Sequence, residues 1–471
     1  MSCDVFVDRL KDAIGQDQVI TDPDIMNSYR TDRTSTVEGS MPRVVTTPTT
    51  ATQVESLVKL ANEFKVPVIP QGALSGLAGG ADPISGSIVI NVAKMNRILD
   101  IDPVNLLATV EPGVINKSLK DTVAKEGFFY PPDPGSYTFC SIGGNIATNA
   151  GGLCCVKYGV TADYVSQLEI ISPTGGLMVL GRKTKKSSAG YRLAQLFVGS
   201  EGTLGIVTKA TMRLRHAPAP VAGTVVASFS TLDAMGLSLK EIASKLSPSL
   251  LEVMDKVTVM AINSWKNLGI DEEAEAVIVA QSDVKGAEGS EELRLIESIC
   301  AAAGSTEIYR TEDPEEADAL LEARRLALTA LERLGPAILD DVGVPVSRIG
   351  DMISEIARIS EMHEIKVGTF GHGGDGNLHP TLILPSRSPD VLKLADRCFA
   401  DIVSAALSMG GTISGEHGVG LIKREYMKDQ YGPLEVDWMR RIKEALDPNG
   451  LFNPNKVLFN PNKVLFDEQY S

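Results

Sequence analysis

The sequence predicts an α+β protein with more than one domain. Its 471 residues exceed the size at which one hydrophobic core usually stops growing. Short apolar runs typical of strands alternate with stretches in which apolar residues recur at helical spacing. Pro218-Ala-Pro220 interrupts this alternation and indicates a domain boundary.

In the first half, a short helix is expected from Val5 to Ile14. Thr50 and Gln53 form a capping box that opens a second helix. Pro173-Thr-Gly-Gly176 indicates a hairpin turn. The remaining expected elements are a helix near 115–125 and strands at 44–45, 66–70, 88–90, 107–110, 168–171, 177–180 and 205–215.

In the second half, the alternation predicts a sheet with helices on one face, followed by helices between 390 and 446. The expected strands are 276–280, 307–310, 338–344, 367–370 and 378–384, and the expected helices are 293–303, 315–334 and 346–362. The predicted boundaries are an N-terminal helix and connector (1–40), a first domain (41–217), a second domain (218–458) and a tail (459–471). The tail begins where a heptapeptide from Phe452 is repeated.

The net charge and the spacing of the cysteines exclude several classes of protein. A net charge of −15 argues against binding to nucleic acid, whose phosphates would be repelled. None of the six cysteines has C-x-x-C spacing, so neither a zinc ribbon nor an iron–sulfur cluster is expected. We find no signal-peptide pattern and no apolar run of membrane-spanning length. A cytoplasmic protein is therefore expected, with any association with a membrane made through a partner.

Three glycine clusters in the first half predict a site for an extended dinucleotide. The first, Pro70-Gln71-Gly72-Ala73-Leu74-Ser75-Gly76, follows a strand, and its backbone N–H groups can turn inward to bind phosphate. The second runs from Ser141 to Gly152, and the third from Gly199 to Gly205. Spacing alone does not identify the dinucleotide, and the first cluster could also be an ordinary glycine-rich loop.

Two short stretches near the C-terminus concentrate three of the five histidines. His372 and His379 lie in one stretch, and Glu416 and His417 in the other. Two imidazoles and a carboxylate form a three-ligand set that leaves coordination positions open, as in catalytic metal sites. A plain hairpin for the first stretch and a helix cap for the second are the alternatives.

Five motifs in order resemble the vanillyl-alcohol oxidase/p-cresol methylhydroxylase flavoprotein superfamily. They are Y-P-P-D-P, I-G-G-N-x-x-T-N-A-G-G, G-S-E-G-T-L-G, G-H-x-G-D-G-N-L-H and G-E-H-G-x-G. Within it, the chain is similar to the branch of D-lactate dehydrogenases, glycolate oxidase FAD subunits and D-2-hydroxyglutarate dehydrogenases. The resemblance implies a two-subdomain FAD-binding domain of the p-cresol methylhydroxylase type, then an α+β (ferredoxin-like) substrate domain and a C-terminal helical segment.

The resemblance also implies roles for individual residues. His372, His379 and Glu416 would bind a divalent metal, usually zinc, with manganese or iron as alternatives. His417 would be the base, while Asn377 and Arg324 would hold the substrate; from sequence alone, Arg324 could equally be a solvated helix residue. FAD would contact Pro70, Gln71, Gly72, Ala73, Leu74, Ser75, Gly76, Pro132, Ser141, Gly144, Asn145, Thr148, Gly152, Glu201, Ile206 and Asn453.

Departures from the family pattern bear on flavin linkage and substrate. Ser75 stands where covalently flavinylated relatives carry His, so non-covalent FAD is expected. Leu339 and Leu328 stand where the hydroxyglutarate branch has Lys and Thr, which favours a short or apolar substrate. We therefore expect oxidation of a short D-2-hydroxy acid (D-lactate or glycolate). The alternatives are a D-2-hydroxyglutarate dehydrogenase or a non-catalytic FAD-carrying subunit of a larger complex.

Electrons are expected to leave through an external acceptor. The chain has no nicotinamide-binding fingerprint, no cysteine set for an iron–sulfur relay and no haem-attachment motif. The expected acceptors are an electron-transferring flavoprotein, an iron–sulfur subunit or a quinone, with oxygen as the alternative. A homodimer or a hetero-complex is expected.

Overall fold

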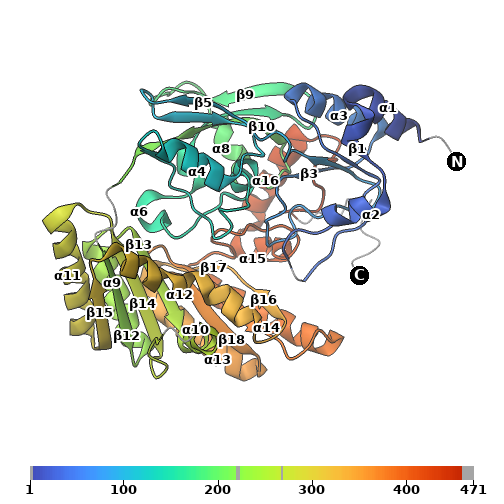
Figure 1. Cartoon of the computed structure of the whole chain (residues 1–471). Helices are drawn as coiled ribbons and strands as arrows, with labels where there is room; N and C mark the ends of the chain where they lie inside the picture. The colour runs from blue at the N-terminus through green and yellow to red at the C-terminus, as the bar shows by residue number, and fades with distance from the viewer. Residues whose placement is uncertain (1–3, 35, 219–222, 267–268, 459–471) are drawn as a thin grey trace. The chain divides into compact units, whose positions relative to one another are not determined.

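The computed structural model describes residues 4–34, 36–218, 223–266 and 269–458 (Figure 1). These residues form two compact units. The first unit comprises residues up to 150, residues 160–217 and the segment that begins at His417; the second comprises Gly151–Gly159 and Pro218–Glu416. No helix within the described ranges is long and apolar enough to cross a membrane.

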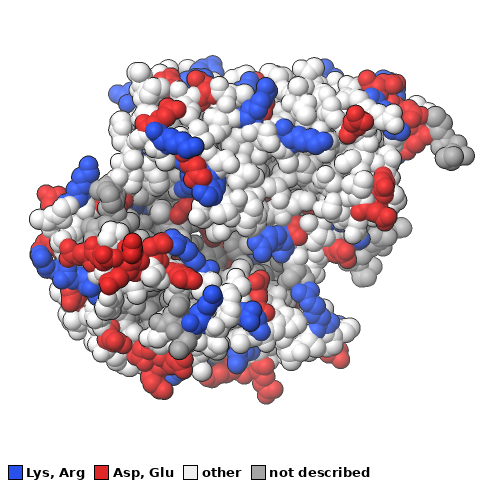
Figure 2. All heavy atoms as spheres, viewed as in Figure 1, with Lys and Arg blue, Asp and Glu red and all other residues white. Residues whose placement is uncertain are grey.

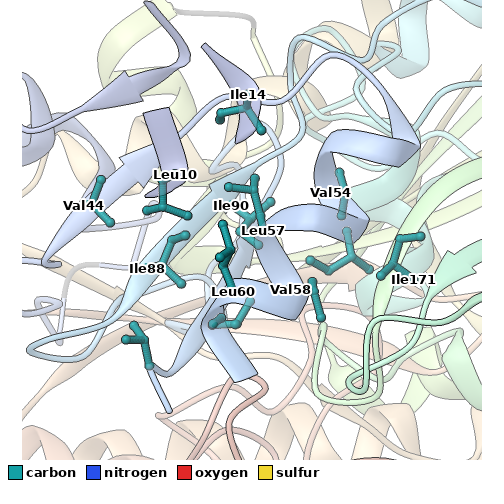
Figure 3. Packing of buried hydrophobic residues seen from close by; sticks show 14 of the residues in the cluster. Leu10, Ile14, Val44, Val54, Leu57, Val58, Leu60, Ile88, Ile90 and Ile171 are labelled. Atoms are coloured by element: carbon teal, nitrogen blue, oxygen red, sulfur yellow. The ribbon is translucent and has the colours of Figure 1, made fainter. Parts of the chain in front are cut away.

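The first unit begins with a small sheet in the order β1-β2-β4-β3, in which β2, β4 and β3 are parallel. Its elements are α1 (Val5–Ile14), β1 (Val19–Ile20), α2 (Pro23–Met26), β2 (Val44–Thr46), α3 (Ala51–Phe64), β3 (Val68–Gln71) and β4 (Ile88–Asn91). The Thr50 side chain caps α3 by accepting from the Gln53 N–H, as the capping box predicts. Apolar residues of α1, α3 and β4 meet in one core (Figure 3).

A second sheet of this unit is antiparallel, in the order β5-β6-β10-β8-β9. One of its faces packs against helices through a core that includes Val110, Ile170 and Met212. The elements are β5 (Ile98–Asp102), β6 (Leu107–Val110), α4 (Asn116–Ala124), β7 (Phe128–Phe129), α5 (Ile142–Thr148), α7 (Thr161–Tyr164), β8 (Val165–Ile171), β9 (Leu177–Gly181), α8 (Leu193–Phe197), β10 (Ile206–Arg213) and β11 (Arg215–His216).

The end of the chain returns to the first unit, which differs from a second domain running to residue 458. Phe452 is fully buried in the core of the small sheet. Val68 donates from its N–H to the Leu451 carbonyl and accepts from the Asn453 N–H, at 2.8 Å each. The returning segment also carries α15 (Met427–Gln430) and α16 (Pro433–Leu446). The predicted tail, 459–471, lies outside the described residues.

The second unit is built on one eight-stranded sheet, in the order β15-β12-β14-β13-β18-β19-β16, with β17 paired to β19. All pairs in this sheet are antiparallel. The strands are β12 (Gly223–Phe229), β13 (Leu250–Asp255), β14 (Ala276–Ser282), β15 (Ser305–Thr311), β16 (Ala337–Leu339), β17 (Val342–Gly343), β18 (Lys366–His372) and β19 (Asn377–Ile383). The helices are α6 (Cys155–Tyr158), α9 (Leu232–Lys245), α10 (Lys256–Lys266), α11 (Gly286–Ala303), α12 (Pro314–Glu332), α13 (Ile349–His363) and α14 (Pro389–Ser408).

Helices cover both faces of this sheet, so the expectation of helices on one face is wrong. On β12, Thr224 points to one face and donates to the Ala317 carbonyl of α12. Its neighbour Gly223 points to the other face, where an added Cβ would lie 2.8 Å from Leu293 of α11. The physical reason is visible in β14 and β19, whose residues are all buried and need cover on both sides.

The α+β fold class is confirmed, and two local predictions are corrected. The expected strand 338–344 breaks into β16 and β17 because Asp340 and Asp341 lie between them. The expected helical run from 390 to 446 is interrupted between α14 and α15. That interruption contains Glu416 and His417, and no helix begins at these two residues, so the alternative of a helix cap is wrong. The stretch around Gly373 is a hairpin that joins β18 to β19.

Candidate functional site

One face of the large sheet gathers the polar residues of the second unit. In the antiparallel register, Glu252 of β13 lies opposite His372 of β18, and Phe370 of β18 lies opposite His379 of β19. Successive side chains of a strand alternate between faces, so these four residues share one face. The same register brings His372 opposite Asn377. Two histidines seven positions apart in sequence therefore become neighbours because they flank a hairpin.

One side-chain atom from each of His372, His379 and Glu416 lies within 3.5 Å of the other two. The two histidine Nε2 atoms are 3.5 Å apart, and Glu416 Oε1 lies 3.5 Å from Nε2 of His372 and 3.3 Å from Nε2 of His379. Ligands about 2.05 Å from a tetrahedral ion are separated by roughly 3.3 Å. The three atoms thus have the spacing of ligands around one metal ion.

Glu252 supports this cluster and was missed in the sequence. Its side chain is fully buried, and its Oε1 lies 2.8 Å from His372 Nδ1. Its Oε2 accepts from Arg324 Nε at 2.5 Å. The signal in the sequence is a carboxylate with apolar neighbours on both sides in the strand Leu250–Asp255, because a buried charge is costly unless it is paired.

Asp341 is the second supporting carboxylate that sequence reasoning did not identify. It accepts from Asn377 Nδ2 at 2.6 Å, from the Ser414 hydroxyl at 2.7 Å and from the Glu416 N–H at 3.1 Å. Its Oδ1 lies 4.0 Å from His379 Nδ1. An added Cβ at Gly415 would lie 2.0 Å from Asn377 Nδ2, so this close approach requires glycine. Asp341 therefore fixes the backbone that presents Glu416.

The buried charges of the cluster stabilise one another. Burial alone would lower the pKa of His372, but the carboxylates of Glu252 and Glu416 raise it well above the ordinary histidine value. Burial would raise the pKa of Glu416, but His372 and His379 hold it well below the ordinary glutamate value. Anionic oxygen at this position suits a bound cation.

Arg324 projects from α12 onto the same face, so it is not a solvated helix residue. It is 7% exposed, and its guanidinium carbon lies 4.6 Å from the centre of the Phe370 ring. Among the residues that the structure describes, its two Nη groups donate to no acceptor. Leu339 lies opposite Thr381 on β19, and Leu328 lies one helical turn from Arg324. Both leucines are partly buried against the apolar cluster that includes Leu250, Met254 and Phe370.

The three predicted glycine clusters converge within the first unit. An added Cβ at Gly72 would lie 2.7 Å from Ser141 Oγ, which joins the first cluster to the second. Glu201 donates from its N–H to the Ala147 carbonyl at 2.8 Å, which joins the second to the third. An added Cβ at Gly202 would lie 3.1 Å from Pro70, which closes the set.

The first cluster has the features of a phosphate-binding loop. In the described part of the chain, none of the backbone N–H groups from Gly72 to Ala78 donates to a protein acceptor. Leu74 has a φ of 55°, a left-handed conformation that helps consecutive N–H groups face one side. This loop fits the pyrophosphate of a dinucleotide.

Other residues expected to contact FAD have structural partners in this unit. Asn116 donates to the Pro132 carbonyl at 3.1 Å and to Asn145 Oδ1 at 2.9 Å, so it holds both next to α5. The Ser141 hydroxyl caps α5 by accepting from the Gly144 N–H, and Thr148 Oγ1 donates to the Gly144 carbonyl. Ile206 is buried at the start of β10.

Three predicted site residues take places that the sequence did not indicate. Glu201 is buried, and its carboxylate accepts from the N–H groups of Val419 at 2.7 Å and Gly420 at 2.9 Å, so it anchors the loop after His417. Asn453 donates its amide to the carbonyls of Gly80 and Glu201. Gly152 belongs to the second unit, whereas His417 begins the segment that returns to the first.

Comparisons with known proteins match two families along the chain, with a boundary between residues 181 and 219. The family described as "FAD linked oxidases, C-terminal domain" matches residues 219–457, and the "FAD binding domain" family matches residues 42–181. The glycolate oxidase subunit GlcD of Bacillus subtilis (strain 168) is 41% identical over 420 residues, which cover 89% of each chain. A D-lactate dehydrogenase of Anaerostipes hadrus is 34% identical over 462 residues, 96% of this chain and 97% of that protein.

Solved structures show the fold. The structure of p-cresol methylhydroxylase with substrate bound has a TM-score of 0.80 at 17% identity and covers 96% of both chains. The 4-ethylphenol oxidase from Gulosibacter chungangensis has a TM-score of 0.79 at 18% identity and covers 98% of this chain and 97% of the other. On the family matches and the relatives together, the chain belongs to the FAD-linked oxidases, with an FAD-binding domain followed by the C-terminal domain of that family.

Proposed function

We propose that the protein is an FAD-dependent dehydrogenase that oxidises a short D-2-hydroxy acid to the 2-oxo acid with the help of a divalent metal. The observation that carries the proposal is the convergence of His372, His379 and Glu416 at 3.3–3.5 Å. Arg324 of α12 is buried against the same face of the sheet, and its two Nη groups are available as hydrogen-bond donors. A 2-hydroxy acid offers a hydroxyl group for the former site and a carboxylate for the latter.

The reaction removes a proton from the substrate hydroxyl and a hydride from C2. Arg324 would bind the substrate carboxylate through its Nη groups, which suit a planar, bidentate acceptor. Asn377 would border the bound substrate, and its amide is held in place because it donates to Asp341 and to the Val342 carbonyl. His417 would take the hydroxyl proton, since imidazole accepts a proton near neutral pH.

Two bound groups supply the remaining chemistry. A divalent cation on His372, His379 and Glu416, zinc by preference and manganese or iron as alternatives, supplies the Lewis acidity that lowers the pKa of the hydroxyl. FAD, on the glycine clusters of the first unit, supplies the acceptor for the hydride.

The chemistry of the apolar residues supports a short substrate. Leu328 and Leu339 offer no charge to a second carboxylate, and an unpaired buried charge is costly. The named activities of the relatives, glycolate oxidase and D-lactate dehydrogenase, agree with this choice. D-2-hydroxyglutarate is the alternative substrate.

We further propose that the reduced protein passes its electrons to a separate acceptor. The GlcD relatives are named as subunits, which supports a hetero-complex. An electron-transferring flavoprotein, an iron–sulfur subunit or a quinone would fill this role. A purely FAD-carrying subunit would not need the metal-type cluster, so its presence favours a catalytic chain.

An anaerobic substrate screen tests the proposal. Purified holoprotein is mixed with D- or L-lactate, glycolate, D-2-hydroxybutyrate or D-2-hydroxyglutarate, and flavin absorbance is followed. We expect rapid bleaching by a short D-2-hydroxy acid. No bleaching by any of them, in protein that retains FAD and metal, would contradict the proposed activity.

A further inference from the structure

We infer that Glu252 is a shared positioning residue that holds His372 and Arg324 in one arrangement. This inference rests on the proposed function. It adds that a single carboxylate couples the metal site to the site for the substrate carboxylate. Glu252 would touch neither the metal nor the substrate.

The first link is the tautomer of His372, that is, which ring nitrogen carries the proton. An ionised carboxylate only accepts hydrogen bonds, so Glu252 Oε1 at 2.8 Å requires the proton of neutral His372 to sit on Nδ1. The lone pair is then on Nε2, the atom that faces His379 and Glu416. Glu252 therefore selects the tautomer that can bind a metal through Nε2.

The second link is the orientation of Arg324. Glu252 Oε2 accepts from Nε, which is only one of the five guanidinium donors. Phe370 packs against the guanidinium plane and leaves that plane little freedom to rotate. The Nη groups are then the donors presented to a ligand. Phe370 also contacts His379, with ring centres 5.3 Å apart, so the same packing borders the second histidine.

The third link is the backbone. Glu252 and His372 are directly opposite in the register of β13 and β18. Glu252 is fully buried, and its strand neighbours Leu250 and Met254 belong to the apolar cluster under α12. In this orientation one carboxylate oxygen contacts His372 and the other accepts from Arg324. The geometry thus makes the two sites interdependent.

Glu252→Gln tests the coupling with little change in volume. Glutamine has one accepting oxygen and one donating NH2 group, so it cannot place an acceptor at both positions that the two Glu252 oxygens occupy beside His372 and Arg324. We expect Zn²⁺ affinity, measured by competition with a chromogenic chelator, to fall by roughly 10–100-fold, as is typical when a ligand loses its orienting partner. We expect KM for D-lactate or glycolate to rise about tenfold or more in the same variant, because Arg324 loses its orientation.

Three variants separate positioning from general destabilisation. Arg324→Lys should raise KM but leave Zn²⁺ affinity within about threefold, because Glu252 still contacts His372. Glu111→Gln breaks the pair between another buried carboxylate and an exposed arginine, Arg97 of the first unit, and should change neither quantity. Glu252→Asp, which keeps the charge, should recover part of the lost Zn²⁺ affinity. Each variant is compared with the wild-type protein at equal flavin content.

The outcomes distinguish this inference from the proposed function. Wild-type protein that binds no Zn²⁺ or oxidises no 2-hydroxy acid would refute the proposed function. Wild-type protein that does both, beside a Glu252→Gln variant with unchanged affinity and KM, would refute the role of Glu252 alone. If the variants do not fold, ¹⁵N-histidine NMR of the wild-type holoprotein decides: a proton on Nδ1 of His372 supports the inference, and a proton on Nε2 alone overturns it.

Discussion

Glu252 and His372 face each other across β13 and β18, with Oε1 of the carboxylate 2.8 Å from Nδ1 of the imidazole. A second carboxylate, Asp341, lies behind the other histidine, His379, at 4.0 Å. Each of the two histidines thus has a carboxylate beside its Nδ1, at hydrogen-bond distance for His372 and at 4.0 Å for His379, and Asp341 also fixes the backbone of Glu416. Metal-binding histidines commonly have such outer partners, which set the tautomer and the ring orientation.

His379→Ala should abolish most of the activity while leaving FAD in place. The loss in kcat/KM should exceed the roughly 10–100-fold typical of residues that only orient a ligand. Flavin content should persist because the loops that fit FAD lie in the first unit. Steady-state kinetics, elemental analysis and the flavin-to-protein ratio are the measurements.

His216→Ala is the matched control for this variant, because His216 is an exposed histidine of the first unit. It should keep full activity and full metal content. Exhaustive chelation of wild-type protein should reproduce the defect of His379→Ala, and added Zn²⁺ or Mn²⁺ should restore turnover. Full turnover by protein shown to contain no metal would rule out metal assistance.

The flavin should be released intact by acid precipitation. The glycine loop from Pro70 to Gly76 contains Ser75 and no histidine, cysteine or tyrosine that could form a covalent link. All yellow colour should move to the supernatant, where chromatography should identify FAD. Colour retained in the pellet would show a covalent flavin, and release of FMN would contradict the dinucleotide.

Leu339→Lys should shift substrate preference towards D-2-hydroxyglutarate. Leu339 shares the sheet face of His379 and Thr381, so a lysine there would place a cation near the substrate tail. The ratio of kcat/KM for D-2-hydroxyglutarate to that for D-lactate should rise by about tenfold or more, a difference of about 1.4 kcal/mol. Leu339→Met keeps the site apolar and should leave the ratio unchanged. A wild-type enzyme that already prefers D-2-hydroxyglutarate would refute the short-substrate proposal.

Glu201 should make stability depend on pH. Burial raises its pKa to about 7 from 4.5, although the N–H groups of Val419 and Gly420 oppose the shift. A raised folded-state pKa means that the stabilisation is complete below pH 4.5 and is lost as pH rises through 7. The free energy of unfolding of wild type should fall relative to Glu201→Gln by up to about 3 kcal/mol between pH 5 and pH 8.

Urea denaturation followed by flavin fluorescence at several pH values measures this difference. Glu63→Gln, at an exposed carboxylate of α3, should show no comparable trend. A wild-type minus Glu201→Gln difference that stays constant, or that rises with pH, would contradict a raised pKa at Glu201.

Local patterns in the sequence predicted most elements and the cluster of His372, His379 and Glu416. The helix Val5–Ile14 and the Thr50 cap depend on nearby residues only, so periodicity and capping rules were sufficient. Glu252 escaped prediction because its role arises from pairing with His372, 120 residues away in sequence. The sequence likewise could not show that Phe452 completes the core of the first unit.

The fate of Glu201 shows the same limit. The resemblance implies contact with FAD, which stays a prediction, and the structure adds that the Glu201 carboxylate accepts from the backbone of Val419 and Gly420. Val419 and Gly420, whose N–H groups bind the Glu201 carboxylate, lie more than 200 positions away from it in the sequence. Motif position therefore located the region of the site but not the partner of each side chain.

Reduced protein should react slowly with oxygen and rapidly with artificial electron acceptors. This prediction follows from our proposal that a separate acceptor reoxidises the flavin. The net charge of −15, with acidic side chains gathered on the surface of the second unit (Figure 2), suits a partner that presents a basic patch.

Stopped-flow mixing of anaerobically reduced protein with oxygen, a phenazine dye or a quinone analogue measures each rate directly. Reoxidation by oxygen at the rate of steady-state turnover would make the protein an oxidase and remove the need for a partner. Reoxidation by dyes alone, together with a rate for a protein acceptor that falls as salt is raised, would support transfer through a transient, charge-steered complex.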